Sequence, residues 1–246
     1  MLKITVLIDN KSLLETTKAE WGFSAYIEFE SLRGLFDTGS SYSTLLYNAS
    51  KLNIDLNRLD FVFISHLHGD HSGALLELIK NHKPNNVFLP SNIKYNDLLA
   101  ISKYVKSARA VDVFTELFPN IFSTGTLKKT VPEQSMIIRL RSCLALILGC
   151  SHHGIIDIIR NIRIYLSTPI IVAIGGYHLS GYNRGYSVGH ALYNMGVQYV
   201  FPCHCTDESA KEGIYAAYKR LTACGVGLHI EISDDCKLEY TILTKK

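Results

Sequence analysis

Short apolar runs alternate with amphipathic segments along most of the chain. Residues 61–65, FVFIS, form a mostly apolar run that predicts a buried strand, whereas residues 73–82 repeat their apolar positions at the spacing of a helix. By the same criteria we expect further strands at residues 3–9, 24–30, 33–39, 85–90, 144–149, 169–176, 197–202, 227–232 and 238–244. We expect further helices at residues 41–53, 97–105, 154–166, 186–196 and 208–223, and short strands with loops between 109 and 141.

This alternation predicts an α/β fold with two sheet-forming halves. No Pro-, Gly- or Ser-rich linker and no repeat interrupts residues 1–246, so we expect the chain to form one domain. Ser41 stands at the start of the first helical pattern, where a hydroxyl side chain is expected to cap the helix.

The composition narrows the classes of function. Apolar residues make up 47% of the chain, which is enough for a sizeable core, and the 25 basic residues barely exceed the 22 acidic ones. We therefore expect no nucleic-acid partner. The apolar runs are too short to span a bilayer, and the N-terminus lacks the longer apolar run of a signal peptide, so we expect no membrane partner. A small-molecule substrate is the expected partner, and self-association stays open.

Six cysteines are present, but their spacing shows no disulfide framework and no CxxC pair. We therefore expect free thiols and a cytoplasmic location.

Histidines follow four of the predicted strands. In α/β sheets, ligands bind outside the carboxyl ends of strands, so these four side chains are expected to converge. They are His66, His152, His178 and His204.

The densest polar cluster is SHLHGDH, which places His66, His68, Asp70 and His71 within six residues. His66 and His68 are two apart, so in an extended segment their rings project to the same side. Neutral imidazole suits zinc, iron and related divalent ions. Four potential ligands so close together would strain one tetrahedral site, so the pattern predicts two adjacent metals.

Later strand ends are expected to complete these metal sites. His204 is one candidate, and either His152 or His153 is the other. His152 lies nearer the strand end and is the preferred ligand, which leaves His153 to line the pocket or to begin the next helix. The remaining histidines lie inside helical or strand patterns and are expected to be surface or core residues; they are His82, His190 and His229.

Three cysteines lie close to these histidines. Alternation along a strand directs Cys203 and Cys205 away from the side that His204 faces, so both are expected to pack structurally. Cys150 lies in the turn that presents His152, and for it both metal ligation and packing stay open.

The segment LFDTG adds a carboxylate after a predicted strand. An Asp-Thr-Gly turn occurs in aspartic proteases, but these need two such motifs. Asp37 is instead expected to accept a hydrogen bond from the second nitrogen of a ligand histidine and so orient it.

SHLHGDH resembles the HxHxDH signature of the metallo-β-lactamase superfamily, and LFDTG is similar to the strand that precedes it there. GCSHHGI, GGYHL and PCHCT resemble a branch of metal-dependent hydrolases that includes dihydropterin-methyl-aminobenzene-ribofuranosyl-phosphate synthase-like proteins. The resemblance covers residues 2–244. It implies an αββα sandwich with a dinuclear metal site at one edge of the sheets. It implies one metal held by His66, His68 and His152, and a second held by Asp70, His71 and His204.

The chain departs from the superfamily where many members carry a bridging aspartate. Here the sequence reads Gly175, Gly176, Tyr177 and His178, with no carboxylate. The two glycines predict a tight turn that aims Tyr177 or His178 into the pocket. The branch usually has histidine near Trp21 and glycine at the position of Asp207, so these departures leave the identity of the substrate open and do not affect the expected metal binding.

From these residues we expect a hydrolase that activates water on an ester or phosphoester, using two divalent ions. Zinc is the expected metal, with manganese or iron as alternatives. Asp70 and His178 are the expected catalytic residues, and Tyr177, His178 and His153 are expected to contact substrate. Basic side chains could assist with an anionic substrate or remain solvated; they are Lys18, Arg33 and Arg184.

Three other hypotheses stay open at this point. The branch name implies a synthase that condenses a pterin with an aminobenzene ribosyl phosphate. The histidine-rich ligand set also permits a di-iron protein that reduces oxygen or senses redox state. The last is a metal-dependent binding protein without catalysis.

Overall fold

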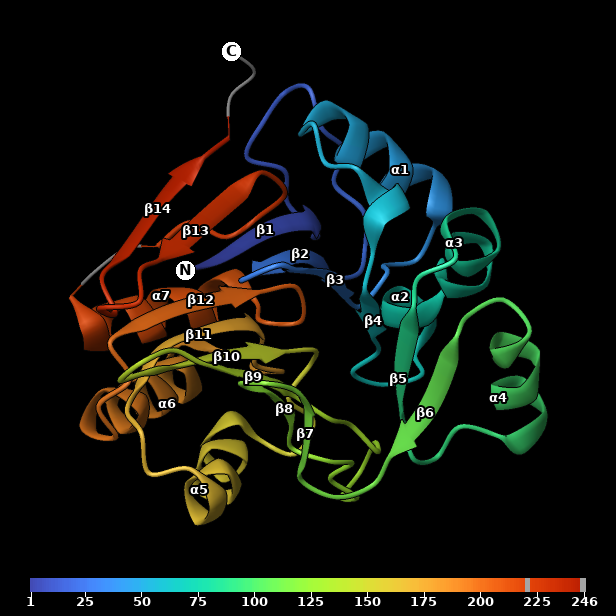
Figure 1. Ribbon diagram of the computed structural model, residues 1–246. Coiled ribbons are helices and arrows are strands. Elements are labelled where there is room, and N and C mark those ends of the chain that lie inside the picture. The colour runs from blue at the N-terminus through green and yellow to red at the C-terminus, as the bar shows by residue number, and fades with distance from the viewer. Residues whose placement is uncertain (220–221, 244–246) are drawn as a thin grey trace.

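The computed structural model describes residues 1–219 and 222–243. Two β-sheets pack face to face, and helices cover the outer face of each sheet (Figure 1). This is the αββα sandwich that the sequence resemblance implies. The ends of two predicted elements, residues 220–221 and residue 244, lie outside the described part of the chain.

The first sheet has eight strands and is built mainly from the N-terminal half of the chain. Its order is β14 (Leu238–Ile242), β13 (Leu228–Ile232), β1 (Leu2–Ile8), β2 (Ser24–Phe29), β3 (Leu32–Phe36), β4 (Phe61–Phe63), β5 (Asn86–Pro90) and β6 (Ser107–Val111). The strands from β3 to β6 run parallel to one another. The connecting helices are α1 (Tyr42–Lys51), a 3-10 turn (Leu56–Arg58), α2 (Gly69–Ser72), α3 (Leu75–His82) and α4 (Tyr95–Ser102). Ser41 caps α1 as predicted, because its side chain accepts from the Thr44 amide.

The second sheet has six strands from the later part of the chain. Its order is β12 (Tyr199–Cys203), β11 (Ile170–Gly176), β10 (Leu144–Leu148), β9 (Met136–Arg139), β8 (Ile121–Ser123) and β7 (Thr115–Phe118). Strands β10, β11 and β12 are parallel, and the helices that follow them cover the outer face; these are α5 (Ile155–Tyr165), α6 (Tyr182–Asn194) and α7 (Glu208–Tyr218).

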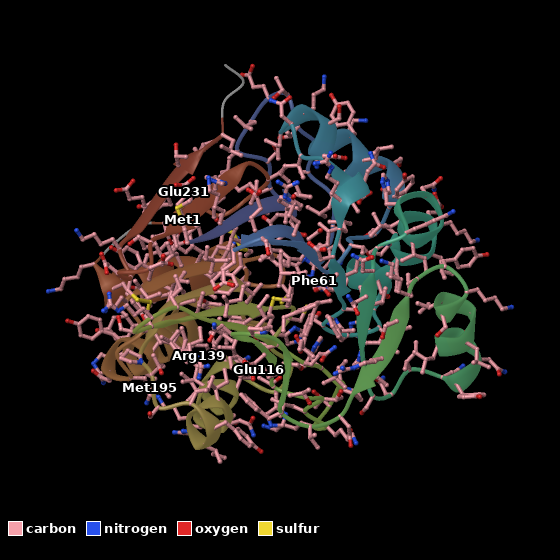
Figure 2. All side chains as sticks on the ribbon, in the orientation of Figure 1. Met1, Phe61, Glu116, Arg139, Met195 and Glu231 are labelled. Atoms are coloured by element: carbon pink, nitrogen blue, oxygen red, sulfur yellow. A yellow bond between two sulfur atoms is a disulfide. The ribbon has the colours of Figure 1, made fainter. Side chains whose placement is uncertain are left out.

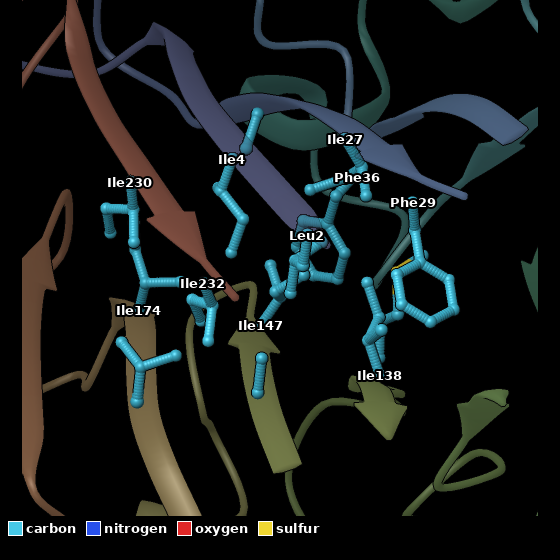
Figure 3. Packing of buried hydrophobic residues seen from close by; sticks show 14 of the residues in the cluster. Leu2, Ile4, Ile27, Phe29, Phe36, Ile138, Ile147, Ile174, Ile230 and Ile232 are labelled. Carbon is cyan, nitrogen blue, oxygen red and sulfur yellow. The ribbon is translucent and has the colours of Figure 1, made fainter. Parts of the chain in front are cut away.

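The main core lies between the two sheets. Figure 3 shows Ile4 of β1 and Ile230 of β13 on the side of the first sheet, facing Ile147 of β10 and Ile174 of β11. Phe61 of β4 is also buried in this layer, near the centre of the view in Figure 2. Two further apolar clusters lie under the outer helices, one on each sheet. The polar strand ends meet at one edge of the sandwich. These three buried apolar clusters fix the strands and helices that lead to that edge.

Helix α6 begins at Tyr182, four residues before the predicted start at 186. The glycine at 185 weakens the helical pattern in the sequence, but the structure needs it. A Cβ added to Gly185 would lie 2.0 Å from the carbonyl oxygen of Ala210, and one added to Gly213 would lie 2.2 Å from that of Tyr182. Small residues let α6 and α7 approach closely, and this tertiary contact outweighs the low helix propensity of glycine.

The expectation of free thiols is wrong for four of the six cysteines. Cys143 pairs with Cys236 across 93 residues, and Cys203 pairs with Cys224 across 21. Spacing could not reveal these pairs, because the partners meet only when distant segments pack together. Cys150 and Cys205 remain free. The free-thiol argument for a cytoplasmic location therefore no longer holds. Within residues 1–219 and 222–243, no helix combines the length and apolar character needed to cross a membrane.

Candidate metal centre

The polar strand ends of both sheets meet at one edge of the sandwich. The first sheet contributes the motif loop, residues 66–71, which follows β4. The second sheet contributes the strand-end loops, residues 150–153 after β10, 177–178 after β11 and 204–205 after β12. Ring contacts join the two sets: the His66 and His152 ring centroids are 4.8 Å apart, and those of His71 and His204 are also 4.8 Å apart.

One group of potential ligands combines His66, His68 and His152, whose ligand atoms all lie within 4.8 Å of one another. His66 Nε2 is 3.1 Å from His68 Nδ1. Two imidazole nitrogens at that distance can share one proton or one cation. These are the three residues that the sequence resemblance assigns to the first metal.

A second group combines Asp70, His71 and His204, again with ligand atoms within 4.8 Å of one another. His204 Nε2 lies 3.1 Å from His71 Nε2 and 3.1 Å from Asp70 Oδ2. His71 Nε2 lies 3.8 Å from the same carboxylate oxygen. These are the three residues that the resemblance assigns to the second metal.

Buried partners hold the other nitrogen of these imidazoles. His71 Nδ1 is 2.7 Å from Asp37 Oδ2, as the sequence predicted for that carboxylate, and His152 Nδ1 is 2.8 Å from Glu133 Oε2. His204 Nδ1 is 3.0 Å from Asn10 Oδ1. Each bond fixes a ring orientation and leaves Nε2 turned toward the neighbouring ligand atoms.

Asp37 also organises the start of the motif loop. It accepts from the Ser65 amide at 2.7 Å and from the Ser65 hydroxyl at 2.7 Å, and that hydroxyl lies 2.9 Å from His66 Nδ1. One fully buried carboxylate therefore orients a histidine of each group.

The sequence analysis missed Glu133 and Asn10. Glu133 is 2% exposed and accepts from the amides of Cys150, Ser151 and His152, so it supports the whole turn after β10. No periodicity marks it, because it lies in a loop far from that turn in sequence. Asn10 does carry a signal, since it follows β1 at the same kind of polar strand end as the histidines.

Backbone conformation sets the direction of several of these side chains. Asp37, Ser151, His178 and His204 all have positive φ, between 46° and 58°, and none is glycine. Each such residue costs on the order of 1–3 kcal/mol, and such outliers concentrate at functional sites. The left-handed turn at His204 also ends β12, so alternation fails there.

Burial keeps most of the histidines neutral. Burial, followed by the neighbouring imidazoles, lowers the pKa of His66, and the same causes lower the pKa of His204 to about 3. Burial also lowers the pKa of His68. Burial by itself would lower the pKa of His71, but the adjacent Asp37 carboxylate raises this pKa overall. Neutral imidazole is the form that binds metal.

The donor set fits a pair of divalent cations. Five imidazoles and one carboxylate supply the ligand atoms of the two groups, and polar side chains hold the second nitrogen of four of these imidazoles, those of His66, His71, His152 and His204. Without cations, closely spaced nitrogens and a carboxylate must share a few protons in a buried setting, which is costly.

Of the two residues after Gly176, the structure aims His178 into the site and Tyr177 into the core. The His178 ring centroid lies 4.7 Å from that of His152, while the Tyr177 hydroxyl donates to the Ala173 carbonyl at 2.8 Å. Tyr177 is 1% exposed but still belongs to the wall of a pocket beside His178, so substrate contact by Tyr177 stays a prediction. Gly175 has φ +132°, and a Cβ there would lie 2.0 Å from the Leu148 carbonyl oxygen, so the backbone approaches closely here, but both glycines belong to strand β11 and not to a tight turn.

His178 lies between two pockets. One, of about 320 Å³, is also lined by His152, His153, Lys129 and Arg184. His153 thus lies at a pocket wall, where its Nδ1 is buried without a hydrogen-bond partner.

The other pocket, of about 730 Å³, is lined by Trp21, His204, Cys205 and Asp207 among others. Trp21 is 63% exposed, and its ring centroid is 5.0 Å from that of His204. Asp207 caps α7 through the Ala210 amide. Both positions that depart from the branch pattern therefore face this pocket.

The cysteines do not follow the alternation argument. Cys203 has the predicted structural role, although in a disulfide and not as the expected free thiol, whereas Cys205 faces the histidines because the chain turns at His204. The hydrogen bond with Cys150 and then those with His178 lower the pKa of Cys205 to about 6, while the same bond and burial raise the pKa of Cys150. The hydrogen bond with Cys205 also raises the pKa of His178.

The other candidate residues have partners elsewhere. Lys18 stacks over Tyr47, and Arg33 lies 3.8 Å from Glu28, so of the three basic candidates only Arg184 lines a pocket beside the histidines. The three histidines expected outside the site form bonds of their own: His82 with Tyr42, His190 with Asn194 and His229 with Thr5.

The fold and this cluster define a class of protein. Residues 24–108 match the family model of the metallo-beta-lactamase superfamily. The chain has the metallo-β-lactamase fold, and the resemblance predicted from the sequence is confirmed. This fold supports a function of the metal-dependent hydrolase type and implies divalent metal binding.

Two relatives are similar to most of the chain. It is 25% identical to the 7,8-dihydropterin-6-methyl-4-(beta-D-ribofuranosyl)-aminobenzene-5'-phosphate synthase of Methanocaldococcus jannaschii, over 82% of this chain and 86% of the relative. The crystal structure of Tm1679, described as a metal-dependent hydrolase of the beta-lactamase superfamily, superposes with a TM-score of 0.79 at 29% identity, over 95% of this chain and 100% of that one.

A third similarity concerns the fold alone. The metallo-beta-lactamase fold protein YhfI from Bacillus subtilis gives a TM-score of 0.66 at 15% identity, over 93% of this chain and 98% of that one.

Proposed function

We propose that the chain is a hydrolase that uses two zinc ions to cleave an ester or phosphoester bond in a small anionic molecule. His66, His68 and His152 would hold one ion, and the group of Asp70, His71 and His204 would hold the other. The observation that carries the proposal is the convergence of these two groups from both sheets onto one edge of the sandwich.

Metal ions, when bound here, supply Lewis acidity and lower the pKa of water. The protein contributes the fixed geometry. Asp37, Glu133 and Asn10 hold the imidazoles in orientations that need no rearrangement when a cation arrives. Preorganised polar groups of this kind stabilise charge that develops during a reaction at little further cost.

His178 is the proposed general acid. Its side chain is exposed, it lines both pockets, and it lies beside His152 at the edge of the metal site. An imidazole in this place can deliver a proton to the leaving group of a substrate held in either pocket. Arg184 and Lys129 add positive charge to the smaller pocket, which favours an anionic group there.

Purification and metal analysis test the proposal directly. We expect close to two zinc ions per chain, turnover of simple phosphoesters or carboxyl esters, and loss of that turnover on chelation with recovery when zinc is restored. A chain that folds but binds no divalent metal would contradict the proposal.

A synthase is the second candidate. Two observations favour it: the relative named as a synthase is similar over most of the chain, and two pockets flank His178, which would suit two organic substrates. The two candidates differ in what they require. A hydrolase consumes one substrate and water, whereas the synthase releases product only when both organic substrates are present.

A further inference from the structure

Cys150 lies among the histidines of both predicted metal groups. It is a free, buried cysteine in the turn after β10, and its Sγ is 3.2 Å from His71 Nε2. Its sulfur forms a set of close ligand atoms with His66 and His71, and another with His152 and His178, each set within 4.8 Å.

A third such set joins Cys150 with His204 and Cys205. His66 and His152 belong to the first predicted metal group, and His71 and His204 belong to the second. The Cys150 sulfur is therefore close to two ligands of each group, which places it between them.

At the end of β11, Gly176 has no side chain beside the sulfur atoms of Cys150 and Cys205. A Cβ added to Gly176 would lie 2.5 Å from Cys205 Sγ and 3.2 Å from Cys150 Cα. The same Cβ would lie 2.6 Å from the Gly149 carbonyl oxygen, so the backbone as well as Cys205 leaves no room for a side chain, and hence for a carboxylate, at Gly176. Cys205 in turn contacts the backbone of the turn, with its Sγ 3.5 Å from the Cys150 carbonyl oxygen.

We propose that Cys150 is a metal ligand whose thiolate sulfur bridges the two metal groups, and that the neighbouring Cys205 is not a ligand. The proposal rests on the proposed metal centre. On metal binding the S–H bond breaks, the proton passes to water, and sulfur–metal bonds form, with no change of oxidation state. A thiolate favours zinc or iron at this site over magnesium or manganese.

X-ray absorption at the zinc edge tests the assignment, because zinc–sulfur and zinc–nitrogen distances differ, at about 2.3 Å and about 2.0–2.1 Å. In the zinc-loaded chain a bridging sulfur predicts one sulfur neighbour for each zinc ion. The Cys205→Ser variant should keep that signal, and Cys150→Ser should lose it.

Cobalt substitution gives an independent readout. The cobalt-loaded wild-type chain and Cys205→Ser should both show a thiolate-to-cobalt charge-transfer band, and Cys150→Ser should not. If Cys150→Ser fails to fold, the wild-type chain and Cys205→Ser still decide, because the other four cysteines are in disulfides.

Four results would overturn the inference. Two bound zinc ions without a sulfur neighbour would do so and leave the proposed function intact. One sulfur for every two zinc ions would show a terminal ligand instead of a bridge, and loss of the signal in Cys205→Ser would assign the sulfur to Cys205. A chain that binds no metal would remove both this inference and the proposed function.

Discussion

The two halves of the site are built in different ways. The motif loop supplies four potential ligands within six residues. Two of them, His66 and His71, are fully buried, and so is Asp37, the carboxylate that supports the loop. The strand-end loops supply their side chains one at a time from three parallel strands, and they also line both pockets. Under the proposed function the first half would hold ions, whereas the second half would both hold ions and meet the substrate.

Both halves nevertheless rest on a buried carboxylate. Asp37 supports the motif loop, and Glu133 supports the turn after β10. Glu133 bonds to a single ligand histidine, whereas Asp37 reaches His71 directly and His66 through Ser65. Variants can therefore show whether the two halves differ in their tasks.

The largest effect is expected for Asp70→Ala in the motif loop. The variant removes a ligand of the second proposed metal, so turnover should fall on the order of 10³-fold or more, with loss of one metal per chain. The fold should persist, because Phe23 donates to the backbone carbonyl of Asp70 and that bond remains. Metal analysis, kinetics and thermal unfolding check this, with the exposed Asp235→Ala as control. A variant that melts far below wild type would assign Asp70 a structural role.

His178→Ala in the strand-end loops should lower the rate by about 10²–10⁴-fold while both metals stay bound, because general acid catalysis contributes about that much. The limb of the pH–rate profile that reports the acid should also disappear. His190→Ala, on the exposed face of α6, is the matched control. If the variant loses a metal instead, His178 is a ligand, and the division of tasks between the two halves fails.

The two carboxylates offer a more direct contrast. Glu133→Gln should weaken one metal by about 10–100-fold, since His152 is the only ligand histidine whose ring it bonds, and the amide oxygen of Gln can still accept from the backbone of the turn. Asp37→Asn should weaken both metals by a similar factor, because it orients a histidine of each group. Stepwise metal titration, read by calorimetry, distinguishes one weakened site from two. If both variants weakened the same number of metal sites, the two carboxylates would not differ in their tasks.

The last prediction concerns the stability of the metal-free chain at acid pH. His204 has a pKa of about 3 when folded and an ordinary value of 6.5 when unfolded, so between these pH values only the unfolded chain binds the proton. Its contribution is complete above pH 6.5 and is lost as the pH falls toward 3, with a limiting slope of about 1.4 kcal/mol per pH unit. The free energy of unfolding, measured with denaturant at a series of pH values, should fall more steeply toward acid pH in wild type than in His204→Gln, by that slope. Parallel curves would show that His204 keeps an ordinary pKa.

Much of the fold could be predicted from local pattern. Apolar runs located the strands, and three- and four-residue spacing located the helices, because each reports which face of an element is buried. The convergence of four histidines also followed, since the carboxyl ends of strands in such sheets meet at one edge. Asp37 could be assigned as an orienting carboxylate, because its motif ends a strand beside the histidine cluster.

The tertiary structure alone decided the rest. The two disulfides and the bond from Glu133 to His152 join segments that are distant in sequence, and local periodicity carries no information about such contacts. The left-handed turn at His204 reversed the expected direction of Cys205, because a single positive φ breaks the alternation of a strand, and only the fold decided that His178 faces the site while the Tyr177 hydroxyl bonds in the core. The sequence by itself therefore determined which residues could bind metal, while packing determined which atoms face one another, since burial and turn geometry act through neighbours that the chain order does not reveal.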